Sequence, residues 1–204
     1  SQQSSLFTFG AEAYRDEMGI TNDLFSLEAC PWGVDCELLE LIDPAPDPED
    51  GPEPTTGLRG VDNFANFLRL LGPPTRGEIV EDVLIGEQIF HNVGCQNCHV
   101  EALETGPALF KALSFKRFSP YGDFLLHDVG TGDGIGQGGA KPNEIRTPPL
   151  WGLRFRGPFL HDGRAANLTE AILLHKEEAE NSRKSFEALS EEQVRVLLVF
   201  LNSL

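Results

Sequence analysis

The pentapeptide Cys95-Gln96-Asn97-Cys98-His99 constrains this chain more than any other feature of its sequence. Two cysteines separated by two residues and followed directly by histidine form the attachment signature of a c-type haem. The two thiols add to the vinyl groups of the porphyrin, and the histidine is placed beneath the iron. We therefore predict one covalent haem c (heme c) per chain, attached to Cys95 and Cys98 and ligated by His99.

Other uses of the cysteines have less support. A redox dithiol also uses Cys-x-x-Cys but needs a thioredoxin-like strand–helix context, and no such pattern surrounds this motif. A four-cysteine zinc site would have to recruit Cys30 and Cys36, whose spacing is unusual for zinc. These two cysteines lie in a loop that contains Pro and Gly. They either close a small disulfide, as in an oxidising compartment, or remain free thiols.

Gly and Pro cluster at residues 72–77, and such clusters commonly separate domains. We therefore predict a haem-binding domain over residues 76–204, preceded over residues 1–75 by a partial domain that lacks a haem motif. Another Pro-rich stretch, residues 43–54, is expected to be an exposed acidic loop or linker. Residues 114–163 are rich in Gly and Pro and are expected to form a long loop with short strands at most.

The predicted fold class is mostly α-helical. Apolar residues at i, i+3, i+4 and i+7 predict amphipathic helices over residues 64–71 and 194–201. Ser190 and Gln193 form a capping box before the second of these helices. Residues 78–91 are expected to form a helix that leads into the cysteine motif.

Two features of these helices bear on a haem site. Gly86 would permit a close contact on the helix before the motif. Asn167 is expected to cap a helix in which Leu168, Ile172 and His175 share one face.

The residue pattern alone leaves the sixth ligand of the iron open. The candidates are one methionine and four histidines: Met18, His91, His127, His161 and His175. Met18 precedes the domain boundary, and His91 comes just before the motif. His175 is favoured because an apolar helix face suits a haem edge, although the same pattern is typical of a buried core histidine.

Composition limits the partners. Acidic residues outnumber basic ones by 32 to 16, and the net charge is −16. Nucleic acid and anionic membrane surfaces are poor partners for such a chain, whereas a cationic protein partner fits it. There is no apolar run of 18 or more residues, so a membrane span is not expected. The chain starts at Ser1 without a signal-peptide pattern, and we expect a processed end or the edge of a fragment.

Several stretches together resemble bacterial di-haem cytochrome c peroxidases, and in particular the branch of di-haem oxidoreductases once called thiol oxidoreductases. The stretches are residues 84–90, 95–99, 146–153, 158–165 and 168–175. The resemblance covers almost all of the C-terminal part. It is weaker over residues 1–75, where residues 19–25 and 64–71 look like the later part of the N-terminal haem domain.

The resemblance implies two cytochrome c-like domains, in which the C-terminal haem passes electrons and the N-terminal haem binds peroxide. It implies that His175 is the distal ligand, which gives a bis-His iron of low reduction potential. His161 would then belong to the cofactor-binding pocket without ligating the iron. The family has two Cys-x-x-Cys-His motifs and this chain has one, so the second haem is expected outside this chain.

Three functions follow as hypotheses. Electron transfer through one haem with bis-His ligation by His99 and His175 is favoured, with redox proteins as partners. The alternative is the electron-feeding half of a di-haem, peroxidase-like oxidoreductase, so enzymatic activity stays open. A structural role of the haem in an assembly is the third. Because c-type haem is attached outside the cytoplasm, we expect a periplasmic or extracellular location.

Overall fold

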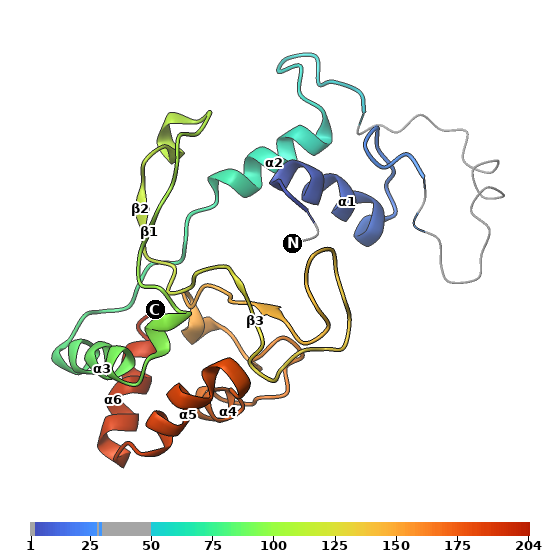
Figure 1. Cartoon of the computed structure of the whole chain (residues 1–204). Coiled ribbons are helices and arrows are strands. Elements are labelled where there is room, and N and C mark those ends of the chain that lie inside the picture. Colours follow the sequence, from blue (N-terminus) through green and yellow to red (C-terminus); the bar gives the residue numbers. More distant parts are fainter. Residues whose placement is uncertain (1–2, 28, 30–49) are drawn as a thin grey trace. The chain divides into compact units, whose positions relative to one another are not determined.

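The computed structural model describes residues 3–27, 29 and 50–204, and Figure 1 traces the chain. The chain divides into two compact units, Ser1–Gly72 and Pro73–Leu204, and the division falls at the cluster of Gly and Pro. The regular structure is mainly helical with little sheet. Cys30 and Cys36 lie outside the described residues, so the choice between a disulfide and free thiols stays open.

The first unit is built on two helices, α1 (Leu6–Met18) and α2 (Gly60–Leu70). Helix α2 confirms the helix expected over residues 64–71, whereas α1 was not predicted. The helices meet through small residues: Ala11 and Ala65 are fully buried, and the rings of Tyr14 and Phe64 lie 5.5 Å apart. Helix α1 is capped by Gly19, whose backbone takes the left-handed conformation that favours glycine.

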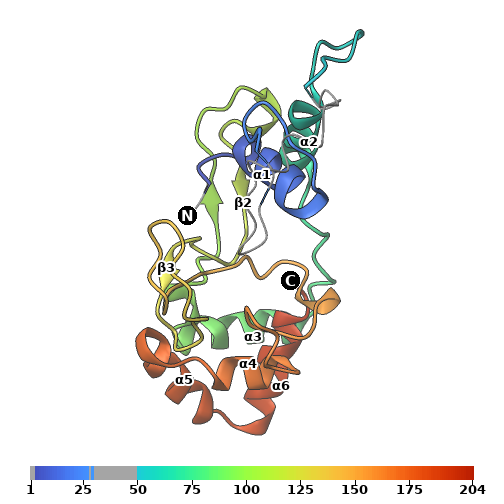
Figure 2. The same ribbon diagram turned by 90° about the vertical axis from the view of Figure 1, so that its right-hand side faces the viewer.

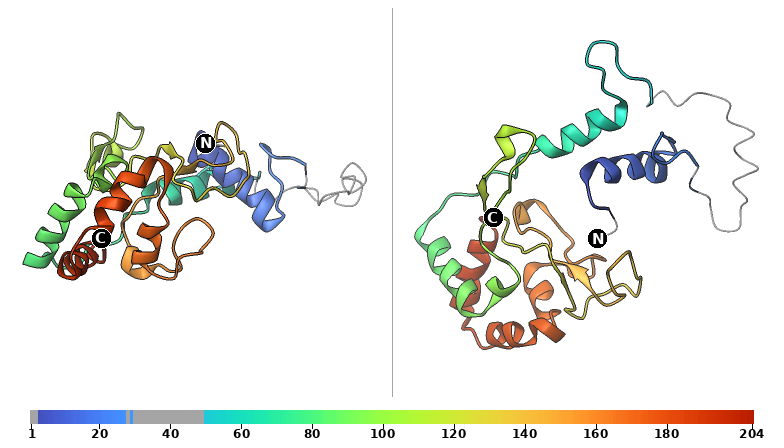
Figure 3. Two further views of the ribbon diagram at one scale, coloured as in Figure 1. Left: turned by 60° about the horizontal axis from the view of Figure 1, so that its bottom comes forward. Right: turned by 45° about the horizontal axis from the view of Figure 1, so that its top comes forward.

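The core of the second unit is the contact between α3 (Glu81–Asn92) and α6 (Glu191–Leu201). The two helices lie side by side in Figure 2 and in both views of Figure 3. Apolar side chains fill the interface, and Phe90, Leu197 and Phe200 are almost completely buried. The capping box of Ser190 and Gln193 is confirmed at the start of α6.

The remaining elements are short, and those within residues 114–163 are two-residue strands and a 3₁₀ turn, as expected for that stretch. The helices are α4 (Leu168–Leu173) and α5 (Glu180–Glu187), and short 3₁₀ turns lie at Cys95–Asn97, Lys111–Leu113, Leu153–Phe155 and Glu177–Ala179. Strand β1 (Leu103–Glu104) pairs antiparallel with β2 (Arg117–Phe118), and β3 (Leu126–His127) pairs antiparallel with β4 (Ile145–Arg146). No helix within the described residues is long and apolar enough to cross a membrane.

One helix is shorter than predicted. Asn167 caps α4 as expected, and its side chain accepts a hydrogen bond from the backbone of Glu170. The helix ends at Leu173, however, so His175 lies in the turn that follows rather than on the helix face. Its backbone N–H donates to the carbonyl of Ile172 at 3.1 Å, which closes a tighter turn after the last helical residue.

Gly86 is the point of closest approach between α3 and α6. A Cβ added there would lie 2.2 Å from the carbonyl oxygen of Val196 and 2.6 Å from the Cβ of Phe200. We therefore expect Gly86→Ala to lower the free energy of unfolding by about 2 kcal/mol, since overpacking outweighs the gain in helix propensity. Urea denaturation of the full chain measures this change. Gly106→Ala is the control, because an added Cβ meets nothing within 4 Å there. Equal stability of the two variants would contradict the close contact.

Candidate haem site

A tight turn follows α3 and carries the cysteine motif. Gly94 takes a left-handed backbone conformation (φ 88°) after the helix, a conformation that strains other residues. The backbone N–H groups of Cys98 and His99 then donate to the carbonyl of Cys95 at 3.3 and 2.9 Å. These bonds gather both thiols and the imidazole onto one turn at the end of a core helix.

The two thiols are free and only partly exposed. Burial raises the pKa of the Cys95 thiol to about 12, and burial also raises the pKa of Cys98. Reactive dithiols need a lowered pKa, because the thiolate is the nucleophile. The electrostatics of this turn therefore disfavour a redox dithiol.

His99 has one ring nitrogen engaged and one available. Its Nδ1 lies 3.0 Å from the carbonyl oxygen of Tyr121, which can only accept, so Nδ1 carries the proton. Burial lowers the pKa of His99 to about 4, so the ring is neutral at physiological pH. Its Nε2 consequently keeps a lone pair, and a backbone carbonyl on Nδ1 is the usual support of a metal-ligating histidine.

The carbonyl that holds His99 is itself anchored in the core. The ring of Tyr121 is 2% exposed and packs against Phe90 and Phe200, with ring centroids 6.0 and 5.5 Å away. Its hydroxyl donates to Glu87 on α3, and the guanidinium of Arg76 lies 5.7 Å from the ring centroid. Burial raises the pKa of Tyr121, so the hydroxyl stays a donor. The orientation of His99 therefore depends on the α3–α6 core.

His175 repeats the arrangement of His99. Its Nδ1 lies 2.7 Å from the carbonyl oxygen of Ala171, so Nδ1 carries a proton and donates to that carbonyl. Within the described residues, no hydrogen bond occupies Nε2 of either ring. Burial is the main cause of the lowered pKa of His99, and electrostatic interactions with both His175 and His127 lower it further.

The other candidate histidines are differently placed. Both ring nitrogens of His127 are bonded to carboxylates, those of Asp123 and Glu178, at 2.8 and 2.9 Å. His161 is half exposed, and its Nε2 lies 3.0 Å from Asp133. His91 uses Nδ1 to contact the side chain of Gln96.

Met18, the remaining candidate, is exposed and belongs to the first unit. His175 is therefore the candidate that shares with His99 an Nδ1–H bonded to a backbone carbonyl and, within the described residues, an Nε2 that no hydrogen bond occupies.

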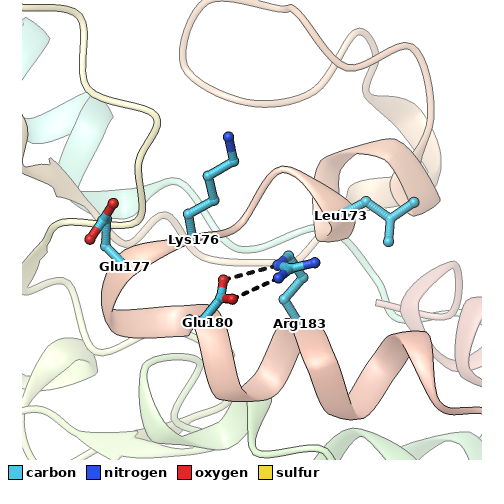
Figure 4. Close-up of a pocket in the computed structure, with 5 residues that line it drawn as sticks. All are labelled: Leu173, Lys176, Glu177, Glu180 and Arg183. Carbon is cyan, nitrogen blue, oxygen red and sulfur yellow. Dashed lines mark hydrogen bonds and ion pairs between the residues drawn. The ribbon is translucent and has the colours of Figure 1, made fainter.

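A hollow of about 500 Å³ lies beside the turn that follows His175. Figure 4 shows its lining, in which a Glu180–Arg183 ion pair of 2.8 Å is accompanied by Lys176, Glu177 and Leu173. Four of these five side chains are charged, which suits water or small ions and not the apolar face of a porphyrin. The cysteine motif does not line this hollow, so it is not the haem site.

The donor set fits a c-type haem. Two partly buried, neutral thiols are separated by two residues. The neutral imidazole that follows them presents an Nε2 that no hydrogen bond occupies within the described residues. His175 also presents an Nε2 that no hydrogen bond occupies within the described residues. Within the described residues, no cluster of three or more His, Cys, Asp or Glu side chains is arranged to hold a bare metal ion.

Sequence reasoning did not find the groups that hold these histidines. The carbonyl of Tyr121 is 22 positions from His99, and the carboxylate of Glu178 is 51 positions from His127. Backbone carbonyls carry no sequence signal. The only hint was the concentration of Gly and Pro in residues 114–163, which indicated a loop that packs on something.

A mainly helical unit with a Cys-x-x-Cys-His turn is the arrangement of a haem redox protein. The family comparison makes this specific: residues 2–204 match the family described as "Di-haem oxidoreductase, putative peroxidase". The chain belongs to this di-haem oxidoreductase family, within the di-haem cytochrome c peroxidase-like superfamily, as its sequence predicted. Its function is therefore a haem-based redox function.

Two relatives illustrate the likeness. The methylamine utilization protein MauG of Methylorubrum extorquens is 32% identical over 127 residues, which are 54% of this chain and 31% of MauG. A hydrazine synthase chain of Kuenenia stuttgartiensis has a similar structure, with a TM-score of 0.49 and 22% sequence identity. That match covers 71% of this chain and 55% of the hydrazine synthase chain. The chain thus spans only part of the length of each relative.

The buried hydroxyl of Tyr121 offers a test of how the site is supported. We expect Tyr121→Phe to lower the free energy of unfolding by about 1 kcal/mol, because Glu87 loses its donor. The visible spectrum of the haem should not change, because His99 bonds to the backbone carbonyl and not to the hydroxyl. Chemical denaturation and absorption spectra measure the two effects. A spectral change without a change in stability would overturn this assignment.

Proposed function

We propose that this chain transfers single electrons through one c-type haem, attached to Cys95 and Cys98 and ligated by His99 and His175. The observation that carries the proposal is the matched pair of histidines. Each donates Nδ1–H to a backbone carbonyl, Tyr121 or Ala171, and keeps Nε2 free. Ligation from both sides leaves no open coordination position, which suits electron transfer and not substrate binding.

When bound, the haem supplies a one-electron carrier whose potential depends on its axial ligands and burial. The chain supplies the orientation of those ligands. The Tyr121 carbonyl fixes the tautomer and tilt of His99, and the Ala171 carbonyl does the same for His175. Two imidazole ligands favour the oxidised iron and therefore a low reduction potential.

The domain assignment is part of the proposal. Residues 76–204 form a cytochrome c-like haem domain, and residues 1–75 are part of a second such domain that carries no haem motif in this chain. His161 belongs to the haem pocket without ligating the iron. It lies on a loop closed by the bridge between Phe159 and Ala165, where it pairs with Asp133.

A second candidate function follows from the family. The family is described as di-haem, whereas this chain contains one Cys-x-x-Cys-His motif. The chain would then be the electron-feeding half of a peroxidase-like oxidoreductase whose other haem lies outside it. In either function the partners are redox proteins, and the attachment chemistry of c-type haem favours a periplasmic or extracellular location.

The two axial ligands can be tested with carbon monoxide, which binds only to an open position on ferrous iron. We expect one haem per chain by pyridine haemochrome, a low-spin spectrum, and no spectral change when carbon monoxide is added to the reduced protein. His175→Ala should give a high-spin iron that binds carbon monoxide, because the distal Nε2 is removed. Added imidazole should restore the low-spin spectrum of this variant.

His161→Ala is the matched control, since it removes a histidine that is half exposed and paired with Asp133. This variant should remain low-spin and inert to carbon monoxide. If the unaltered protein binds carbon monoxide, the distal position is open and the peroxidase-like function takes first place. If His175→Ala stays low-spin while His161→Ala does not, His161 is the ligand.

A further inference from the structure

A chain of three side chains connects the cysteine motif to the turn that carries His175. The backbone N–H of Asp123 donates to the carbonyl of Cys98 at 2.9 Å. The carboxylate of Asp123 accepts from Nε2 of His127 at 2.8 Å, and Nδ1 of His127 donates to Glu178 at 2.9 Å. We call Asp123, His127 and Glu178 the His127 clamp.

At one end of the clamp, Glu178 forms hydrogen bonds with the backbone next to the turn that carries His175. The second carboxylate oxygen of Glu178 accepts from the N–H of Asp128 at 3.0 Å, and the N–H of Glu178 donates to the carbonyl of Asp128 at 3.1 Å. One residue after His175, the N–H of Lys176 donates to the carbonyl of Val129 at 2.9 Å. Residues 127–129 are thus joined to residues 176–178 at four points.

At the other end of the clamp, Asp123 and His127 are held by hydrogen bonds of the β3–β4 sheet. Strand β3, which contains His127, pairs with β4, and the N–H of Thr147 donates to the carbonyl of Leu125 at 2.9 Å. The N–H of Leu125 in turn donates to the other carboxylate oxygen of Asp123 at 2.9 Å. Asp123 and His127 are mostly buried, with side chains 11% and 18% exposed. A displacement of His127 would therefore be resisted by the sheet.

The clamp is charged throughout. A carboxylate on each ring nitrogen makes both nitrogens donors, so His127 is an imidazolium and cannot ligate iron. Its carboxylate neighbours raise the pKa of His127, and its positive charge helps to lower the pKa of Glu178. Hydrogen bonds between charged partners are roughly twice as strong as neutral ones.

We propose that His127 is a positioning residue, which holds the turn carrying His175 at a fixed distance from the turn carrying His99. The proposal rests on the proposed bis-His function. No residue of the clamp ligates the iron, yet His175 lies after the end of α4 and depends on its neighbours for its place. Without the ion pair to His127, two backbone hydrogen bonds, donated by Lys176 and Glu178, would lose their charged support. The bond from the N–H of Asp128 to the Glu178 carboxylate would lose it too.

The test uses the full chain with its haem attached. We expect His127→Phe to raise the fraction of reduced haem that binds carbon monoxide by about tenfold, because two charge-assisted hydrogen bonds are lost. Glu178→Gln keeps an oxygen for the N–H of Asp128 but loses the charge, and it should give a smaller rise. His127→Arg, which can donate to both carboxylates, should restore most of the inertness to carbon monoxide.

Lys141→Ala is the matched control. Lys141 forms an exposed ion pair with Glu144 in the same loop, at 3.1 Å, outside the clamp. This variant should be as inert to carbon monoxide as the unaltered protein. The proposal is overturned if His127→Phe or, where that variant does not fold, Glu178→Gln keeps full haem content and ignores carbon monoxide.

Amide hydrogen exchange separates this proposal from the proposed function. We expect His127→Phe to speed exchange of the amides of Asp128, Lys176 and Glu178 by about tenfold, while amides of α3 and α6 are unchanged. If the unaltered protein itself binds carbon monoxide, the bis-His function fails. The exchange measurement then decides the clamp alone: faster exchange of these three amides supports it, and unchanged exchange overturns it.

Discussion

The aromatic core of the second unit and the position of His99 depend on the close approach of α3 and α6 at Gly86. It lets Phe90 and Phe200 meet at a centroid distance of 5.3 Å, and Tyr121 packs on both rings. The carbonyl of Tyr121 holds His99, and the end of α3 sets where the cysteine turn begins. A methyl group at Gly86 would push the two helices apart and thereby loosen the aromatic layer on which the orientation of His99 depends.

The two proposed iron ligands are held by the same kind of hydrogen bond but by different means. His99 bonds to a carbonyl 22 positions away, so its orientation is fixed by tertiary packing. His175 bonds to a carbonyl four positions away, at the end of α4, so its orientation relative to its own helix is local. Local structure does not fix the distance between the turn that carries His99 and the turn that carries His175. The ion pairs of His127 with Asp123 and Glu178 connect these two turns.

Elements with strong local signals could be predicted from the sequence. The capping box of Ser190 and Gln193, the close contact at Gly86 and the helix before the motif were all found where the pattern placed them. Helix α5 was missed because its sequence is mostly polar and charged, with Phe186 as its one buried residue. The end of α4 was placed too late because Leu174 and His175 continue the apolar spacing, although the hydrogen bonds there already form a tighter turn.

The site shows the same division between local and long-range information. The Cys-x-x-Cys-His spacing predicted which residues form the turn, because the chemistry of attachment acts over five consecutive residues. The role of His127 could not be read from the sequence, since its partners Asp123 and Glu178 are 4 and 51 positions away. The residue pattern ranked His127 below His175 as a candidate ligand of the iron. The structure instead occupies both of its nitrogens with carboxylates. In the proposed haem site, His127 would therefore support the ligand through its charge, without touching the metal.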